Sequence, residues 1–213
     1  MKKVWGMLVL FLALAGPIYS GPTLPYDLNP VKPEIPEAGH YWSKFHQEVW
    51  FHLGVSYLFK EKYLESYNAF YLAATYDPLA PEVYQNLAFV AFKMGDFREA
   101  AAALSVSIEL EPNNAEAHHL LGVIYTIYAM YDNAIEELEK AIAISPEDPL
   151  IHYDLGFARE FGGQYGLAQE SYRAALEINP QFAEAQHRLD VVAEKVSRDQ
   201  ESLGREEVFR RGK

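Results

Sequence analysis

The stretch from Glu116 to Pro146, EAHHLLGVIYTIYAMYDNAIEELEKAIAISP, decides the fold of this chain. Apolar residues recur at helical spacing in both of its halves: Leu121, Ile124 and Tyr128 in the first, and Ala134, Leu138 and Ala141 in the second. Few residues separate the two patterns, so the chain must reverse around Met130. Pro146 ends the unit, because proline cannot continue a helix. The stretch therefore predicts two short amphipathic helices joined by a tight turn, a unit too small to bury its apolar face alone.

The same pattern recurs along the chain at a fixed spacing of 34 residues. The registers that keep this spacing are Pro78, Pro112, Pro146 and Pro180; Leu53, Leu87, Leu121 and Leu155; Gly54, Ala88, Gly122 and Gly156; Ser66, Ala100, Ala134 and Ala168; Phe70, Leu104, Leu138 and Tyr172; and Ala73, Ser107, Ala141 and Ala175. Self-similarity of this kind is typical of a helical solenoid, in which stacked neighbours bury the face that each unit leaves open.

In these registers the chain resembles the tetratricopeptide repeat family. The family pattern is carried by Trp50, Leu53-Gly54, Tyr57, Ser66, Phe70, Ala73 and Pro78 in the first copy, and by Leu121-Gly122, Tyr125, Ala134, Leu138, Ala141 and Pro146 in the third. The departures are His118 and His152 at the large-aromatic position, and Ala91 and Arg159 at the Tyr position. The resemblance covers residues 47–180. It implies an all-α fold, a right-handed helical-repeat solenoid of four tetratricopeptide-like helix–turn–helix units plus a C-terminal capping helix.

The repeat domain is expected to span residues 40–198. We expect repeats at about 47–80, 81–114, 115–148 and 149–182, then a cap at 183–198. The helices should run over residues 41–59 and 63–76, 81–94 and 97–110, 115–128 and 131–144, and 149–162 and 165–178. The first helix should start early and cover the N-terminal end of the stack, because Trp42, Phe45 and Val49 share one helical face. Residues 199–213 are expected to form a charged tail.

Residues 1–20 have the pattern of a secretory signal peptide. Lys2 and Lys3 precede an uncharged apolar run from residue 4 to residue 15, which is shorter than the about 20 residues that span a membrane. Cleavage is expected after Ala15 or Ser20, with an uncleaved membrane anchor as the alternative. In either case the repeats would be exported, to a periplasmic or extracellular location.

Residues 21–39 are expected to link this segment to the repeats. They contain Pro22, Pro25, Pro30, Pro33 and Pro36, which disfavour helix and favour extended polyproline II structure. The segment is interpreted as a semi-rigid spacer. The alternative is a ligand for a proline-binding groove.

Composition restricts the classes of partner. The formal net charge of −12 would repel nucleic acid and anionic lipid, so we expect no nucleic-acid partner, and membrane contact only through an uncleaved N-terminal segment. The chain has no cysteine, which excludes disulfides and thiolate metal sites.

The sequence shows no nucleotide-binding glycine motif, nucleophile elbow or metalloprotease pair, so we expect a protein that is not an enzyme and has no cofactor. The alternative is a metal-dependent enzyme that uses His118, His119 and His152, with Asp154 nearby. His118 and His119 are adjacent, so they point about 100° apart on a helix and cannot chelate one ion together. His118 and His152 occupy equivalent places on neighbouring first helices, whose axes should be roughly 8–10 Å apart, which is far for a shared metal. Both His118 and His152 are therefore interpreted as packing residues in the aromatic slot.

The resemblance implies that side chains of the first helix of each repeat line an inner, concave face. Twelve positions carry over, and we call them the first-helix strip: Phe51, Val55, Phe59, Gln85, Phe89, Lys93, His119, Val123, Ile127, Tyr153, Phe157 and Phe161. The carboxylate clamp known in the family would fall on Phe51, Val55, Asn86, Glu116 and Leu120, where no cation is available to hold a carboxylate.

The apolar character of the strip predicts a non-enzymatic protein–protein interaction scaffold in the cell envelope. Its partner would be a protein or peptide that lays an apolar helix or extended segment in the groove, with Phe51, Phe89, Tyr153, Phe157 and Phe161 as anchors. Two alternatives stay open. The groove is filled by the chain's own linker or capping helix, or the chain is a self-assembling structural protein, a homo-oligomer whose repeats stack end to end.

Overall fold

The computed structural model describes the chain from Tyr41 to Arg211, and its side chains from Lys44 to Arg198. The expected signal peptide at 1–20 and the linker at 21–39 lie outside the described residues. No helix in the described part is both long and apolar enough to cross a bilayer.

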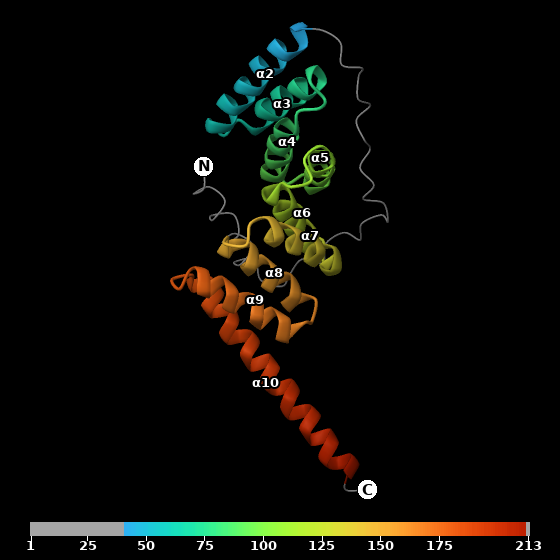
Figure 1. Cartoon of the computed structure of the whole chain (residues 1–213), viewed down its shortest axis with the longest axis vertical. Helices are drawn as coiled ribbons and strands as arrows, with labels where there is room; N and C mark the ends of the chain where they lie inside the picture. The colour runs from blue at the N-terminus through green and yellow to red at the C-terminus, as the bar shows by residue number, and fades with distance from the viewer. Residues whose placement is uncertain (1–40, 212–213) are drawn as a thin grey trace.

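The described chain folds into helices that pair into four helix–turn–helix repeats followed by one long helix (Figure 1). The helices are α2 (Tyr41–Phe59), α3 (Tyr63–Tyr76), α4 (Pro81–Met94), α5 (Phe97–Leu110), α6 (Ala115–Ile127), α7 (Tyr131–Ile144), α8 (Pro149–Phe161), α9 (Tyr165–Ile178) and α10 (Ala183–Arg211). Each helix packs mainly against the helices before and after it in the chain. The expected all-α repeat solenoid with a C-terminal capping helix is confirmed.

The turn inside each repeat depends on one backbone position with positive φ. Glu61, Gly95, Ala129 and Gly163 recur every 34 residues, with φ between 56° and 81°. Glycine adopts this left-handed conformation without strain, whereas Glu61 and Ala129 adopt it at some steric cost. The repeat therefore imposes its turn geometry even where the sequence has no glycine.

Small residues set the distance between the two helices of a repeat. A Cβ added at Gly122 would lie 2.6 Å from Leu138 Cγ, and one at Gly54 would lie 2.8 Å from the Phe70 ring. A Cβ at Gly156 would meet the Tyr172 ring at 2.7 Å. The glycine register thus lets the bulky residue of the second helix sit directly on the first helix.

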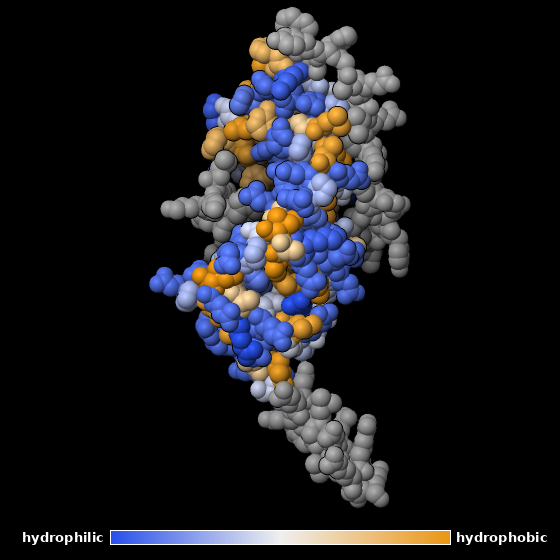
Figure 2. All heavy atoms as spheres, in the orientation of Figure 1, coloured by the Kyte–Doolittle hydropathy of each residue, from blue (hydrophilic) through white to orange (hydrophobic). Residues whose placement is uncertain are grey.

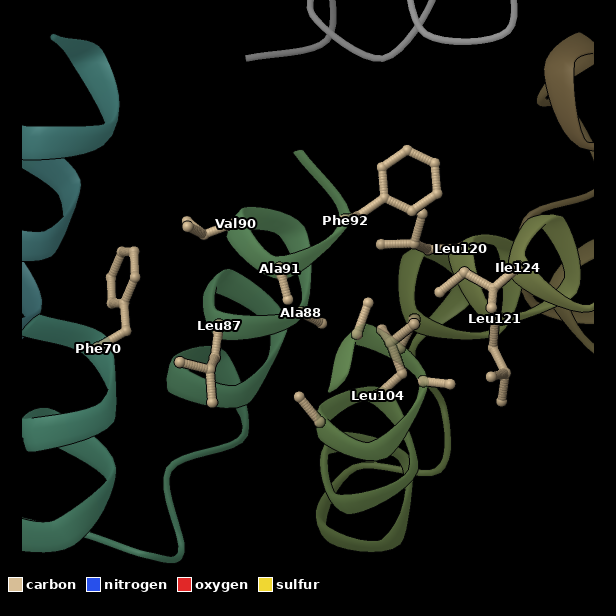
Figure 3. Packing of buried hydrophobic residues seen from close by; sticks show 14 of the residues in the cluster. Phe70, Leu87, Ala88, Val90, Ala91, Phe92, Leu104, Leu120, Leu121 and Ile124 are labelled. Carbon is tan, nitrogen blue, oxygen red and sulfur yellow. The ribbon is translucent and has the colours of Figure 1, made fainter. Parts of the chain in front are cut away.

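The core runs continuously from one repeat to the next. Figure 3 shows residues of one buried cluster that draws Phe70 from α3, Leu87 from α4, Leu104 from α5 and Leu121 from α6. Leu87, Leu121 and Leu155 are each 4% exposed, because each first helix is covered by the repeat before it. The stacking of repeats therefore completes a core that one repeat could not form.

Arg159, at one of the positions that depart from the family pattern, ties two repeats together. Its guanidinium donates from Nη1 to the hydroxyl of Ser171 at 2.9 Å and from Nη2 to Glu139 at 2.7 Å. Ala91, at the equivalent position of the second repeat, is 1% exposed and lies in the apolar core.

The end of the capping helix differs from the expectation. The sequence predicts a cap that ends at residue 198 and a separate tail, whereas α10 is one helix from Ala183 to Arg211 (Figure 1). Residues 199–211 contain three Glu and three Arg and no proline, so a helix that has already formed can continue through them.

The expected apolar face of α2 is present but is not covered. Phe45 is 58% exposed and Val49 is 47% exposed, so the start of α2 does not bury these side chains.

Candidate binding surface

The first-helix strip falls on α2, α4, α6 and α8, one helix in each repeat. Phe59 and Phe161 are exposed, at 78% and 45%. The half-buried members are Phe51, Val55, Gln85, Phe89, Lys93, Ile127 and Phe157. The buried members are His119, Val123 and Tyr153. The accessible apolar side chains therefore lie mostly in the first two repeats and at the end of the fourth.

Tyr153 is not available as an anchor for a partner, which corrects the expectation from the sequence. It is 1% exposed, and its ring lies 5.6 Å from the ring of Tyr172 and 5.0 Å from the ring of Phe182, measured between centroids. Phe182 directly precedes α10, so the approach of the capping helix buries this position.

The fourth-repeat end of the strip is contacted by α10, although Phe161 stays 45% exposed. The guanidinium carbon of Arg188 lies 4.9 Å from the ring centroid of Phe157 and 5.7 Å from that of Phe161. These distances are within the range of a cation–π interaction. The alternative in which the chain fills its own groove thus fits the fourth repeat. In the second repeat a cation also lies near an aromatic ring of the first-helix strip. Lys93 Nζ is 5.4 Å from the centroid of the Phe89 ring.

A buried carboxylate fixes α10 on the fourth repeat. Glu160 of α8 is 3% exposed and accepts hydrogen bonds from the Tyr172 hydroxyl at 3.0 Å and from Lys195 Nζ at 2.8 Å. Arg188 adds a second cation, with Nη1 at 3.6 Å from Glu160. Burial, followed by the neighbouring charge of Glu160, raises the pKa of Tyr172 far above its ordinary value. We call Glu160, Tyr172, Arg188 and Lys195 the α10 latch.

The latch could not be predicted from the sequence, because Glu160 and Lys195 are 35 residues apart and have the pattern of ordinary surface charges. A pairing of this kind depends on where α10 lies, which periodicity does not determine.

His119 belongs to a buried pair between two repeats. Its Nε2 lies 2.6 Å from Oδ2 of Asp154, and both side chains are under 10% exposed. Burial raises the pKa of Asp154, and the hydrogen bond from His119 opposes this effect in part. Because His119 is on α6 and Asp154 on α8, the pair connects the first helices of the third and fourth repeats.

His118 and His152 do not join this pair. His118 donates from Nε2 to the carbonyl of Pro112 at 3.0 Å and directs Nδ1 toward Glu137, 2.6 Å away. His152 Nε2 donates to the carbonyl of Pro146 at 2.8 Å. No group of three potential metal ligands is found among the residues that the structure describes. The histidines therefore have separate partners, each on a different structural element.

Comparison with known proteins agrees with this geometry. Models of the tetratricopeptide repeat match residues 60–124 and 150–182, and a model of the TPR repeat matches residues 130–160. No curated protein matches the chain in sequence.

Solved structures have the same fold. A crystal structure of the MamA protein aligns with a TM-score of 0.70 at 22% identity, over 75% of this chain and 87% of that chain. MamA from Desulfovibrio magneticus RS-1, residues 41 to the end, aligns with a TM-score of 0.68 at 19% identity, over 78% and 92% of the two chains. YrrB, described as a TPR protein with an unusual peptide-binding site, aligns at 0.63 and 22% identity, over 67% and 73%. The repeat registers, the helix pairs and these matches together show that the chain belongs to the tetratricopeptide repeat family.

Proposed function

We propose that this protein is a non-enzymatic scaffold that binds an apolar helix or extended segment along the first-helix strip of its first three repeats. The observation that carries the proposal is the position of Arg188, whose side chain projects from a helix onto Phe157 and Phe161. The chain thus already uses the last part of the strip to hold a helix.

The first two repeats offer the most accessible apolar side chains for such a segment. Phe59 is 78% exposed, and Phe51, Val55 and Phe89 are half-buried on the same set of helices. Aromatic side chains that become buried at an interface dominate its binding energy. In Figure 2, hydrophobic residues gather over the end that holds α2 and α3 and recur between polar areas lower in the view.

The buried polar pairs favour a structural role over catalysis. His119 with Asp154 connects α6 to α8, and Glu160 with Lys195 connects α8 to α10. A scaffold needs this rigidity, because a preformed surface loses less conformational entropy on binding.

The basic start and short apolar run of residues 1–20 support a location outside the cytoplasm, in the periplasm or beyond. We propose that the repeats act in the cell envelope after export. The N-terminal residue of the native protein tests this location. Mass spectrometry should find Gly16 or Gly21, and an intact Met1 on a cytoplasmic protein would contradict the proposal.

Selection of peptides from a random display library on the full chain tests the binding mode. We expect the selected peptides to carry apolar residues at helical or alternate spacing. Substitution of Phe59→Glu together with Phe89→Glu should lower their affinity at least about tenfold, because a carboxylate buried in an apolar contact is strongly disfavoured.

Leu167→Glu is the matched control, because Leu167 is 44% exposed on α9, outside the strip. It should leave peptide binding unchanged, and all variants should keep the helical circular-dichroism signal. Peptides that bind the Phe59/Phe89 double variant as well as they bind the wild type would contradict the proposal.

A further inference from the structure

The N-terminal end of the stack presents an apolar face that the other repeats bury. Val49 on α2 occupies the register of Val83, Ala117 and Ile151, which are 0%, 1% and 2% exposed, yet Val49 is 47% exposed. In the later repeats this register is covered by the second helix of the preceding repeat, because α3 packs on α4, α5 on α6 and α7 on α8. No repeat precedes α2 in the part of the chain that the structure describes.

We call Phe45, Val49 and Leu53 the α2 end face, because they follow one another at four-residue intervals on the same side of the helix. Phe45 is 58% exposed, and Leu53 is half-buried although its equivalents are 4% exposed.

The two ends of the stack are unlike each other. At the C-terminal end, Asp190 of α10 is exposed at the register that holds glycine in Gly156 and Gly122. A polar residue there prevents another helix from packing closely and suits a solvent-facing cap. The α2 end face has no such polar residue, because Phe45, Val49 and Leu53 are all apolar, so it has the composition of a surface that is covered.

The sequence that leads into α2 has the right pattern to cover this face. A polyproline II helix has three residues per turn, so in that conformation Pro22, Pro25, Leu28 and Val31 would fall on one side. Extended proline-rich segments bind surfaces rich in aromatic residues with a low entropic cost, because the bound conformation is already favoured in the free chain.

Length and connection also fit. At about 3.1 Å per residue, residues 22–31 span roughly 28 Å. The α2 end face, from Phe45 to Leu53 at about 1.5 Å per residue, is roughly 12 Å long, so the segment is long enough to cover all of it. The residues between Val31 and Tyr41 are enough for the chain to reverse its direction. A segment tethered in this way has an effective concentration in the millimolar range, which favours it over a second copy of the chain.

We propose that residues 22–31 lie along the α2 end face of the same chain and close the N-terminal end of the stack. This inference goes beyond the proposed function, because it concerns the end of the solenoid and not the first-helix strip. It also holds for both expected cleavage points, since each leaves residues 22–31 in the mature chain.

Cross-linking tests the proposal, and the absence of natural cysteines makes the result specific. The full chain carries Asn29→Cys on the linker with Glu48→Cys, an exposed position beside Val49. The control chain carries Asn29→Cys with Asn68→Cys, an exposed position on α3 of the same repeat. A short bis-maleimide reagent is added to each, and the intramolecular product is measured by mass spectrometry over time.

If the linker is docked, the chain with cysteines at positions 29 and 48 should cross-link at least about tenfold faster than the chain with cysteines at positions 29 and 68. Adding Val49→Glu should abolish the difference while the helical circular-dichroism signal stays unchanged. Equal rates for the two pairs would overturn the proposal, because they would show that the linker does not dock. Cross-linked dimers as the main product would also overturn it and would assign the face to a second copy of the chain.

Discussion

The α10 latch makes a strong prediction for the substitution Glu160→Gln. The carboxylate of Glu160 is buried and is held by Lys195 at 2.8 Å, by the Tyr172 hydroxyl at 3.0 Å and by Arg188 at 3.6 Å. Glutamine has nearly the same shape and can still accept a hydrogen bond from Tyr172. It removes the charge that offsets the two cations of α10.

The size of the stability loss depends on how far Lys195 and Arg188, the cations paired with Glu160, are exposed to solvent. Breaking a fully buried ion pair by removing one charge costs about 3–5 kcal/mol, and a single hydrogen bond to a charged group contributes about 1.5–3 kcal/mol. The Lys195 side chain is 40% exposed and that of Arg188 is 20% exposed, so water partly solvates both after the substitution. We therefore expect Glu160→Gln to lower the free energy of unfolding by about 2–3 kcal/mol.

Chemical denaturation measures the loss, and hydrogen exchange locates it. Exchange should become faster in α9 and in the first part of α10, while α4 and α5 keep their protection, because stability in a solenoid is carried by neighbouring units. Glu139→Gln is the matched control. Its carboxylate also pairs with an arginine, Arg159, at 2.7 Å, but is 52% exposed, so the cost should be at most about 1 kcal/mol. If Glu160→Gln costs no more than Glu139→Gln, the latch does not hold α10 and the reasoning is refuted.

Two further predictions concern the repeat core and the pair between repeats. Gly122→Ala should lower the free energy of unfolding by about 1–3 kcal/mol in a denaturation series, because its Cβ would lie 2.6 Å from Leu138 Cγ, whereas Gly166→Ala, with nothing within 4 Å, should be neutral or stabilising. Equal effects of the two changes would disprove this packing. The raised pKa of Asp154 means that its protonated form is favoured in the folded state, so its contribution to stability is greatest at low pH and is lost as pH rises through that pKa. Asp154→Asn should therefore gain stability relative to wild type as pH rises above the ordinary pKa of an aspartate, and a difference independent of pH would contradict this assignment.

The sequence predicted the repeat architecture closely because its evidence is local and repeated. Leu53, Leu87, Leu121 and Leu155 show the register of the core, and the helices lie within one residue of the expected ranges through α9. Proline and glycine at fixed positions determine where each helix begins and where the chain turns, and this information lies within a few residues of each boundary.

The candidate surface was predicted less well, because accessibility depends on what covers each residue. The first-helix strip was inferred from register alone. Phe51 is half-buried, whereas Tyr153 in the same register of the fourth repeat is buried, with the Phe182 ring beside it. The pairing of His119 with Asp154 likewise joins residues 35 positions apart, although both lie in a cluster that the sequence singled out.

By itself, the sequence determined which residues form helices, how the helices pair and which side chains face the core, because periodicity records which side of each helix is buried. Only the tertiary structure decided how the stack ends. There α10 covers the fourth repeat through Glu160 and Arg188, and α2 leaves Val49 exposed. The reason is that an internal repeat is covered by copies of itself, which the period predicts. A terminal repeat is covered by whatever follows or precedes it, and the period contains no information about that contact.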